Sequence, residues 1–167
     1  MPILTLIARL LTACPVLLAL SGCGSPCDRT GCDALSSVAA DDQVSSLAGV
    51  VATETDVISN GCQECGFYST TLSLWPLTTP VADQASVKAI VTGSSAPITI
   101  QADQRYRQPL DPGTYLVCRL PTCTSVDIVA GHVTPMNVKM VYGPTQFIVF
   151  DPLTRSRITT PQWNVGY

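Results

Sequence analysis

The sequence predicts an all-β fold, a single antiparallel β-sandwich, and three observations support this prediction. From Leu47 onward, short runs rich in β-branched residues alternate with Gly, Pro, Asn and Asp, a pattern typical of strands separated by turns. Several runs alternate apolar and polar residues with a period of two, as a strand with one buried face does. Beyond the first segment, no stretch offers ten residues of convincing helical periodicity.

Nine strands are expected, and each should bury one face. Leu72 and Leu74 alternate with polar neighbours, as do Val126 and Ile128. The same pattern places Ile98 and Ile100, and then Met136, Val138 and Met140, on buried faces, with Asn137 and Lys139 on the opposite face of their strand. The expected strands are residues 47–55, 68–75, 86–92, 97–101, 103–108, 114–119, 124–129, 134–141 and 146–150.

Two turns separate these strands. Pro112 fixes φ near −65° and Gly113 can adopt the positive φ of a type II turn, which predicts a hairpin between the strand ending near Gln108 and the strand starting at Thr114. Gly131 is expected to close a second turn before the strand that follows it.

The first segment has the properties of an export signal. Residues 10–20 are apolar apart from Thr12, are interrupted by Pro15 and follow Arg9. Eleven helical residues span only about half of a bilayer core, so the run fits the apolar region of a signal peptide better than a membrane span. A longer span reaching back to Ile3 would bury Arg9 at a cost of about 2.5 kcal/mol or more.

The end of this segment resembles the lipobox of bacterial lipoprotein precursors, which Leu20, Ser21, Gly22 and Cys23 match at every position. The resemblance implies that residues 1–22 are removed as a lipoprotein signal peptide. It also implies that Cys23 receives a diacylglycerol group and becomes the acylated first residue, with palmitate among its acyl chains. The alternative is an ordinary secreted protein with a chance LSGC.

The resemblance also implies a location. Each buried CH₂ of an acyl chain contributes about 0.8 kcal/mol, so two or three chains would anchor the protein stably in a membrane. Gly24 follows the cysteine in place of the Asp that resembles an inner-membrane retention signal, so in a Gram-negative cell we expect the outer membrane. The turn-rich residues 23–46 then form a lipidated, flexible tether.

The cysteine count predicts disulfides. Of eight cysteines, Cys14 leaves with the signal and Cys23 carries lipid, so six remain in the mature chain. An even number in an exported protein favours disulfide bonds, and these six form three close pairs, although fifteen connectivities are formally open. We expect the local pairs Cys27–Cys32, Cys62–Cys65 and Cys118–Cys123.

The Cys62–Cys65 pair has two other interpretations. A C-x₂-C pair is also half of a zinc site, but His132 is the only histidine that could contribute further and the compartment is oxidising. A thioredoxin-like redox role requires a βαβ context that the flanking sequence lacks. We therefore expect no metal and no cofactor.

A second resemblance concerns the domain itself. Residues 47–141 resemble carboxypeptidase-regulatory-like domains of the prealbumin type, with an opening strand at Ala48, Gly49 and Val50. The resemblance implies a Greek-key sandwich used for stability or contact. The middle segment GCQECG and the extension GPTQFIVF depart from the family pattern. With this extension, we expect the domain to cover residues 47–150 and a C-terminal tail to cover residues 151–167. The motif of the closing half consists of Tyr106, Leu110, Pro112, Gly113, Tyr115 and Gly131.

The sequence offers no recognisable catalytic set, and we expect no enzyme. Any Ser-His-Asp or Cys-His arrangement must use His132, which lies in a Gly-led turn, and no G-x-S-x-G motif or phosphate-binding glycine loop is present. Removing Arg9 leaves eight basic and twelve acidic side chains, a net charge of −4, which disfavours a nucleic-acid partner.

The remaining features favour contact with other molecules. Arg105 and Arg107 should share a solvated strand face, with Tyr106 in the core. The tail should pack across the sandwich, and Trp163 and Tyr167 are candidate partner contacts if exposed. We expect a structural or protein-binding role in the cell envelope. The alternatives are an accessory lipoprotein subunit of an outer-membrane machine for motility, adhesion or export, and a glycan or small-ligand module with exposed Trp75 or Trp163.

Overall fold

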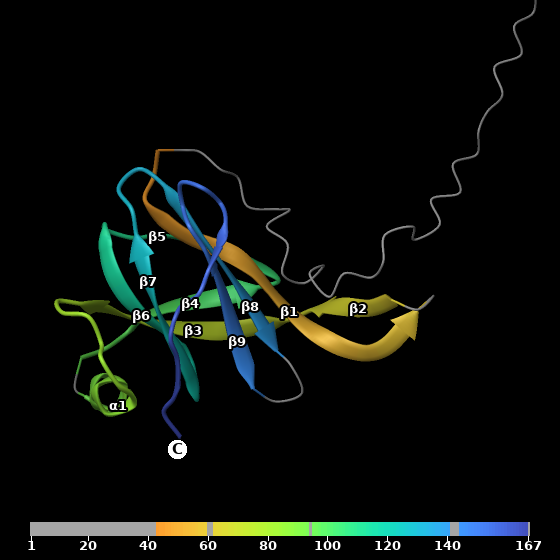
Figure 1. Cartoon of the computed structure of the whole chain (residues 1–167), viewed down its shortest axis with the longest axis horizontal. Coiled ribbons are helices and arrows are strands. Elements are labelled where there is room, and N and C mark those ends of the chain that lie inside the picture. Colours follow the sequence, from red (N-terminus) through yellow and green to blue (C-terminus); the bar gives the residue numbers. More distant parts are fainter. Residues whose placement is uncertain (1–42, 60–61, 94, 141–143, 167) are drawn as a thin grey trace, which may run out of the picture.

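A computed structural model describes residues 43–59, 62–93, 95–140 and 144–166, and within residues 54–67 it describes only the backbone. The described residues fold as a β-sandwich with one short helix (Figure 1). The predicted all-β fold is therefore confirmed. The strands are β1 (Ser46–Ser59), β2 (Cys62–Phe67), β3 (Ser69–Leu77), β4 (Ile98–Asp103), β5 (Arg105–Pro109), β6 (Gly113–Arg119), β7 (Thr122–Ile128), β8 (Val133–Met140), β9 (Thr145–Phe150), β10 (Arg157–Ile158) and β11 (Gln162–Asn164).

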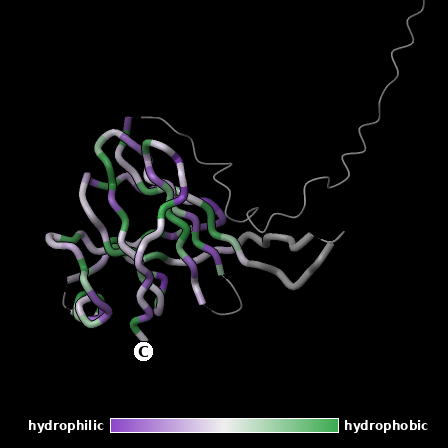
Figure 2. Tube along the Cα trace, in the orientation of Figure 1, coloured by the Kyte–Doolittle hydropathy of each residue, from purple (hydrophilic) through white to green (hydrophobic). Residues whose placement is uncertain are grey.

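The strands follow one hydrogen-bonded path, β10-β9-β8-β1-β5-β4-β3-β6-β7-β11. Neighbouring strands run antiparallel except β1 and β8, which pair in parallel from Ser46 opposite Val133 to Thr53 opposite Met140. The path folds back on itself, so the inward residues of β1, β8 and β9 meet those of β3, β6 and β7 in one core. This core includes Leu47, Val51, Leu72, Leu74, Val117, Val126, Met136, Val138, Phe147 and Val149. Figure 2 shows hydrophobic and hydrophilic residues alternating along these strands.

The second half of β1 leaves the sandwich. β1 pairs with β2 from Ala52 opposite Phe67 to Ser59 opposite Cys62, with a register shift between Glu54 and Ile58, and beyond Thr53 β2 is its only partner strand among the described residues. Figure 1 shows the two strands as an arm that projects from the body of the domain. The observed strand β1 is therefore longer than the expected strand 47–55. Its second half forms a hairpin with β2 and does not pack in the sandwich, so the hydrophobic pattern does not mark it.

The predicted strand at residues 86–92 is wrong, because this segment forms the helix α1 (Gln84–Thr92). Asp83 caps the helix: its side chain accepts hydrogen bonds from the backbone N–H of Ser86 at 2.8 Å and from the Ser86 hydroxyl at 2.7 Å. Val87, Ile90 and Val91 have helical spacing and all pack on the same cluster. Nine residues give little helical periodicity, and the β-branched residues among them favour a strand in a sequence-based prediction.

The predicted hairpin around Pro112 and Gly113 is also wrong. β5 pairs with β1 and β4, whereas β6 pairs with β3 and β7, so the loop between β5 and β6 joins strands that are not neighbours. Leu110 is buried in the core, and its backbone N–H donates to the carbonyl oxygen of Ser45 at 3.0 Å. This contact holds the loop at the head of β1, where it crosses from one layer to the other.

Other predictions hold only in part. Leu72, Leu74, Val126 and Ile128 are buried as expected, whereas Ile98 is 37% exposed. On β8 the expected polar face is also buried, because Asn137 is 1% exposed and Lys139 is 6% exposed. β8 therefore buries both of its faces.

Candidate interaction surface at the C-terminal seam

A second hydrophobic cluster lies on the outer face of β3, β6 and β7. Strand alternation directs Trp75, Leu116, Cys118 and Cys123 away from the sandwich core, since their neighbours Leu74, Val117 and Val126 point into it. α1 covers this face with Val87, and the tail covers it with Val165, which is 4% exposed. The parts of these strands that carry the second cluster are therefore buried on both sides.

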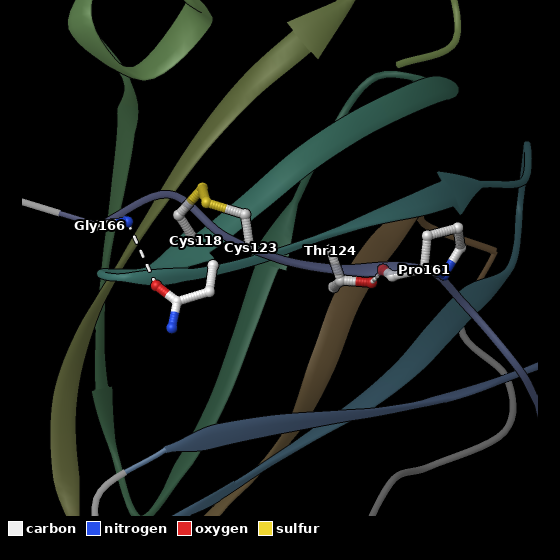
Figure 3. Close-up of a disulfide and its surroundings, with 6 residues drawn as sticks. Cys118, Cys123, Thr124, Pro161 and Gly166 are labelled. Atoms are coloured by element: carbon white, nitrogen blue, oxygen red, sulfur yellow. Dashed lines mark hydrogen bonds between the residues drawn. A yellow bond between two sulfur atoms is a disulfide. The ribbon is translucent and has the colours of Figure 1, made fainter. Parts of the chain in front are cut away.

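A disulfide between Cys118 and Cys123 lies in this second cluster, as the sequence predicts (Figure 3). The two residues are opposite each other on β6 and β7, with Cα atoms 4.1 Å apart. A loop of this size restricts the unfolded chain by about 2 kcal/mol. The disulfide therefore fixes the turn between β6 and β7.

The other predicted disulfide and lipid sites fall on cysteines whose side chains the structure does not describe. Cys23, Cys27 and Cys32 lie outside the described residues. Cys62 and Cys65 lie on β2, where the structure describes only the backbone. Their pairings stay predictions.

The tail is ordered against the disulfide-linked turn. β11 pairs antiparallel with β7, which places Trp163 opposite Cys123, and the backbone N–H of Val165 donates to the carbonyl oxygen of Pro121 at 2.9 Å. Trp163 is half-buried against the second cluster. The predicted partner contact is thus partly accessible at this residue, while Tyr167 lies outside the described residues.

The tail also fills the seam between β7 and β9. The side-chain amide of Gln162 donates to the carbonyl oxygen of Phe147 at 3.0 Å, and its oxygen accepts from the backbone N–H of Phe147 at 3.1 Å. Gln162 lies on β11, so its side chain extends the hydrogen bonding of β7 and β11 to β9. The hydroxyl of Thr124 donates to the carbonyl oxygen of Pro161 at 2.8 Å along the same seam. The predicted packing of the tail across the sandwich is confirmed.

Arg119 joins three strands next to this seam. Its Nε donates to the Thr70 hydroxyl at 3.1 Å and its Nη1 donates to the Thr145 hydroxyl at 2.8 Å. These contacts link the end of β6 to the starts of β3 and β9. Because β3 follows β2 directly, they lie beside the root of the arm.

The registers give the sandwich two ends. One end is at the head of β1, where the carbonyl oxygen of Ser45 accepts from the N–H of Leu110 and the Ser45 hydroxyl accepts from the N–H of Gly131 at 2.9 Å. The opposite end, which we call the seam end, contains Arg119, the disulfide, Trp163 and the base of the arm. β1, β6 and β8 all run toward this end. The chain therefore comes in at one end and presents Trp163 at the other.

The structure also places the other residues that the sequence singled out. Trp75 is 5% exposed and its indole N–H donates to the carbonyl oxygen of Ser95 at 3.2 Å, so it cannot stack on a bound sugar. Arg105 and Arg107 are exposed on β5 and Tyr106 is buried, which confirms the predicted division of faces. His132 is half-buried in a turn, where its backbone N–H donates to the carbonyl oxygen of Val129 at 3.1 Å.

The titratable groups with shifted pKa values have local structural causes. Hydrogen bonds from Ser86 lower the pKa of Asp83, and hydrogen bonds from Thr154 lower the pKa of Asp151. Burial raises the pKa of Tyr106 and also that of Tyr115. Among the residues whose side chains are described, no three of the His, Cys, Asp and Glu groups are placed to hold a metal ion.

The described residues line several open grooves, among them one of about 290 Å³ where the start of β3 meets the end of β4, lined by Thr70, Ala102 and their neighbours. Another of about 510 Å³ at the head of β1 is lined by Val44, Ile98, Pro109 and their neighbours, and one of about 470 Å³ lies between the end of β3 and α1. None of these three grooves is lined by Gln162 or Trp163. Within the described part of the chain, no helix is long and apolar enough to cross a membrane.

Comparison of the chain with protein-family models, with curated proteins and with solved structures finds no match. The two resemblances drawn from the sequence therefore stay predictions.

Proposed function

We propose that this chain is a lipid-anchored, non-enzymatic protein of a bacterial cell envelope with a structural or protein-binding role. The observation that carries the proposal is the LSGC motif at residues 20–23, which follows an apolar segment and precedes a turn-rich stretch. Lipid on Cys23 would anchor the chain in a membrane, and the tether of residues 23–46 would connect this anchor to β1, which begins at Ser46. The prealbumin-type relationship of residues 47–141 belongs to the same proposal.

The two ends of the sandwich support a binding role. The tether leads to the head of β1, whereas Trp163, the disulfide-linked turn and the arm lie at the seam end. An anchored domain of this form would present the seam end to other envelope components. Partly exposed Trp residues are frequent among the residues that dominate binding energy at protein interfaces.

Detergent partitioning tests the anchor. The mature wild-type chain should enter the detergent-rich phase of a phase-separating detergent, and a Cys23→Ala variant should stay in the aqueous phase because no acyl chain can be attached. A wild-type chain that remains in the aqueous phase would contradict the proposal.

The accessory-subunit alternative rests on Trp163. It predicts that defined envelope proteins co-purify with the wild-type chain and are lost from the Trp163→Ala variant. The Asn164→Ala variant, which changes the exposed neighbouring residue, should retain them. Equal recovery with both variants would place the contact elsewhere. The glycan alternative is weaker, because Trp75 is buried and only Trp163 of the two tryptophans is accessible.

A further inference from the structure

The outward face of β1, β8 and β9 is buried, although it belongs to neither hydrophobic cluster. Leu47 and Val51 of β1, and Phe147 and Val149 of β9, point into the sandwich core, so the residues between them point outward. In the outward set, Ala48 is 4%, Val50 8%, Ala52 2%, Ile148 1% and Phe150 7% exposed. None of these residues is part of either cluster.

The registers arrange these residues in rows across the three strands. Ala48, Pro135 and Phe150 form one row, Val50, Asn137 and Ile148 the next, and Ala52, Lys139 and Gln146 the third. We call these nine residues the outer patch. Six of them are apolar, and the other three are Asn137, Lys139 and Gln146.

Nothing in the described part of the chain lies over the outer patch. The described strands all belong to the sheet path or to the arm, and α1 packs on the second cluster with the tail. Ser46 lies at the head of the same face, and its hydroxyl is buried and has no hydrogen-bond partner among the described residues. A further layer over these apolar side chains would account for their low exposure.

Cationic side chains flank the outer patch. Arg107 lies opposite Ala48 on β5, and Arg157 lies opposite Phe150 on β10, so one row has an arginine at each end. Arg105 lies opposite Val50, and Lys139 belongs to the third row. An occupant with an apolar centre and acidic residues would match this pattern.

We infer that residues 33–42, DALSSVAADD, cover the outer patch of the same chain. The segment has Leu35 and Val38 as apolar side chains and Asp33, Asp41 and Asp42 as acidic ones, with no basic residue. It ends beside β1, where Gln43 has a φ of 60°, a left-handed conformation that turns the chain sharply. Ten residues reach about 33 Å when extended, enough to run back over three rows spaced about 7 Å apart.

This docking changes the tether and does not depend on the lipid. If residues 33–42 are bound to the sandwich, only residues 24–32 remain as free linker. A flexible linker of that length has a root-mean-square span of about 17 Å, compared with about 26 Å for residues 24–45. In an anchored protein, the seam end would then stand at a more defined distance from the membrane.

Amide hydrogen exchange on the full mature chain tests the inference. We expect residues 33–42 to exchange at least about tenfold more slowly than an unstructured peptide. The L35D/V38D variant should lose this protection while the strands of the sandwich keep theirs, because the changes lie outside the sandwich. The matched S36D/S37D variant adds the same charge without removing apolar contacts and should retain protection.

Two results would overturn the inference. One is exchange of residues 33–42 at the unstructured rate in the wild-type chain. The other is protection that disappears on dilution, which would identify a second copy as the occupant of the outer patch. Detergent partitioning of Cys23→Ala is independent of both results, so failure of the anchor and failure of the docking are distinguishable.

Discussion

At the scale of single residues, a contact between Gly49, Tyr106 and Met136 joins three strands of one layer. The Tyr106 hydroxyl donates to the carbonyl oxygen of Met136 at 2.5 Å, across β1. A Cβ atom on Gly49 would lie 1.8 Å from the same oxygen. Only glycine at position 49 therefore allows the hydrogen bond and the parallel pairing of β1 with β8 to coexist.

A Gly49→Ala substitution should destabilise the domain by about 2 kcal/mol or more, because the new methyl group must displace a backbone carbonyl in a packed layer. Urea unfolding measures the change. Gly93→Ala is the matched control, since its Cβ would come no closer than 3.0 Å to a neighbouring atom at an exposed helix end, and it should change stability much less. Equal losses in the two variants would contradict this account of Gly49.

The buried hydroxyl of Tyr106 predicts a pH dependence. Burial raises the pKa of Tyr106 above its usual value of 10.0, so the folded state keeps a proton that the unfolded chain releases in alkali. The stability that depends on this proton is complete below pH 10 and falls as the pH rises further. Tyr106→Phe should lose about 1 kcal/mol at pH 7 with the hydrogen bond, and the difference from wild type should shrink at pH 11. Urea unfolding at both pH values checks this, and a constant difference would contradict it.

At the scale of elements, α1 stabilises the second cluster only if its first turn is capped. Asp83→Ala should therefore lower the free energy of unfolding by about 1 kcal/mol, since the N–H of Ser86 loses its acceptor. Asp83→Asn keeps a capping oxygen and should be close to wild type in urea unfolding. If Asp83→Asn is as unstable as Asp83→Ala, the cap is not the source of the effect.

Loss of the disulfide between Cys118 and Cys123 should change the packing of the tail at Trp163. Replacing Cys118 and Cys123 together by Ala should lower stability by about 2 kcal/mol and shift the fluorescence emission of Trp163 to longer wavelength, because Trp163 lies opposite Cys123 on β11. The matched variant with Cys62 and Cys65 changed to Ala should leave that emission unchanged. An unchanged spectrum in the first variant would show that β11 packs independently of the disulfide.

The sequence patterns predict strands well where one face is buried and one is solvated. Leu72 and Leu74 on β3 are examples, and the local pair Cys118–Cys123 follows from proximity alone. Prediction fails on β8, where Asn137 and Lys139 are polar but covered, and on α1, where nine residues give too little helical periodicity to outweigh β-branched composition. β10 and β11 are two and three residues long, too short for any period.

At the scale of the whole molecule, the tail closes a sandwich that would otherwise leave β7 and β9 with open edges. Gln162 and Arg119 make this closure through contacts between distant segments. Their roles depend on topology, so the sequence identifies Trp163 as a candidate contact but not the seam that positions it. The same topology separates the head of β1 from the seam end, and this separation is what an anchored binding module requires.

The most direct test of the anchored module is the intact mass of the membrane-extracted protein, measured with and without reduction and alkylation. We predict a chain that begins at an acylated Cys23 and shows six alkylated thiols only after reduction. A soluble chain that carries Cys23 as an unmodified thiol would contradict the account.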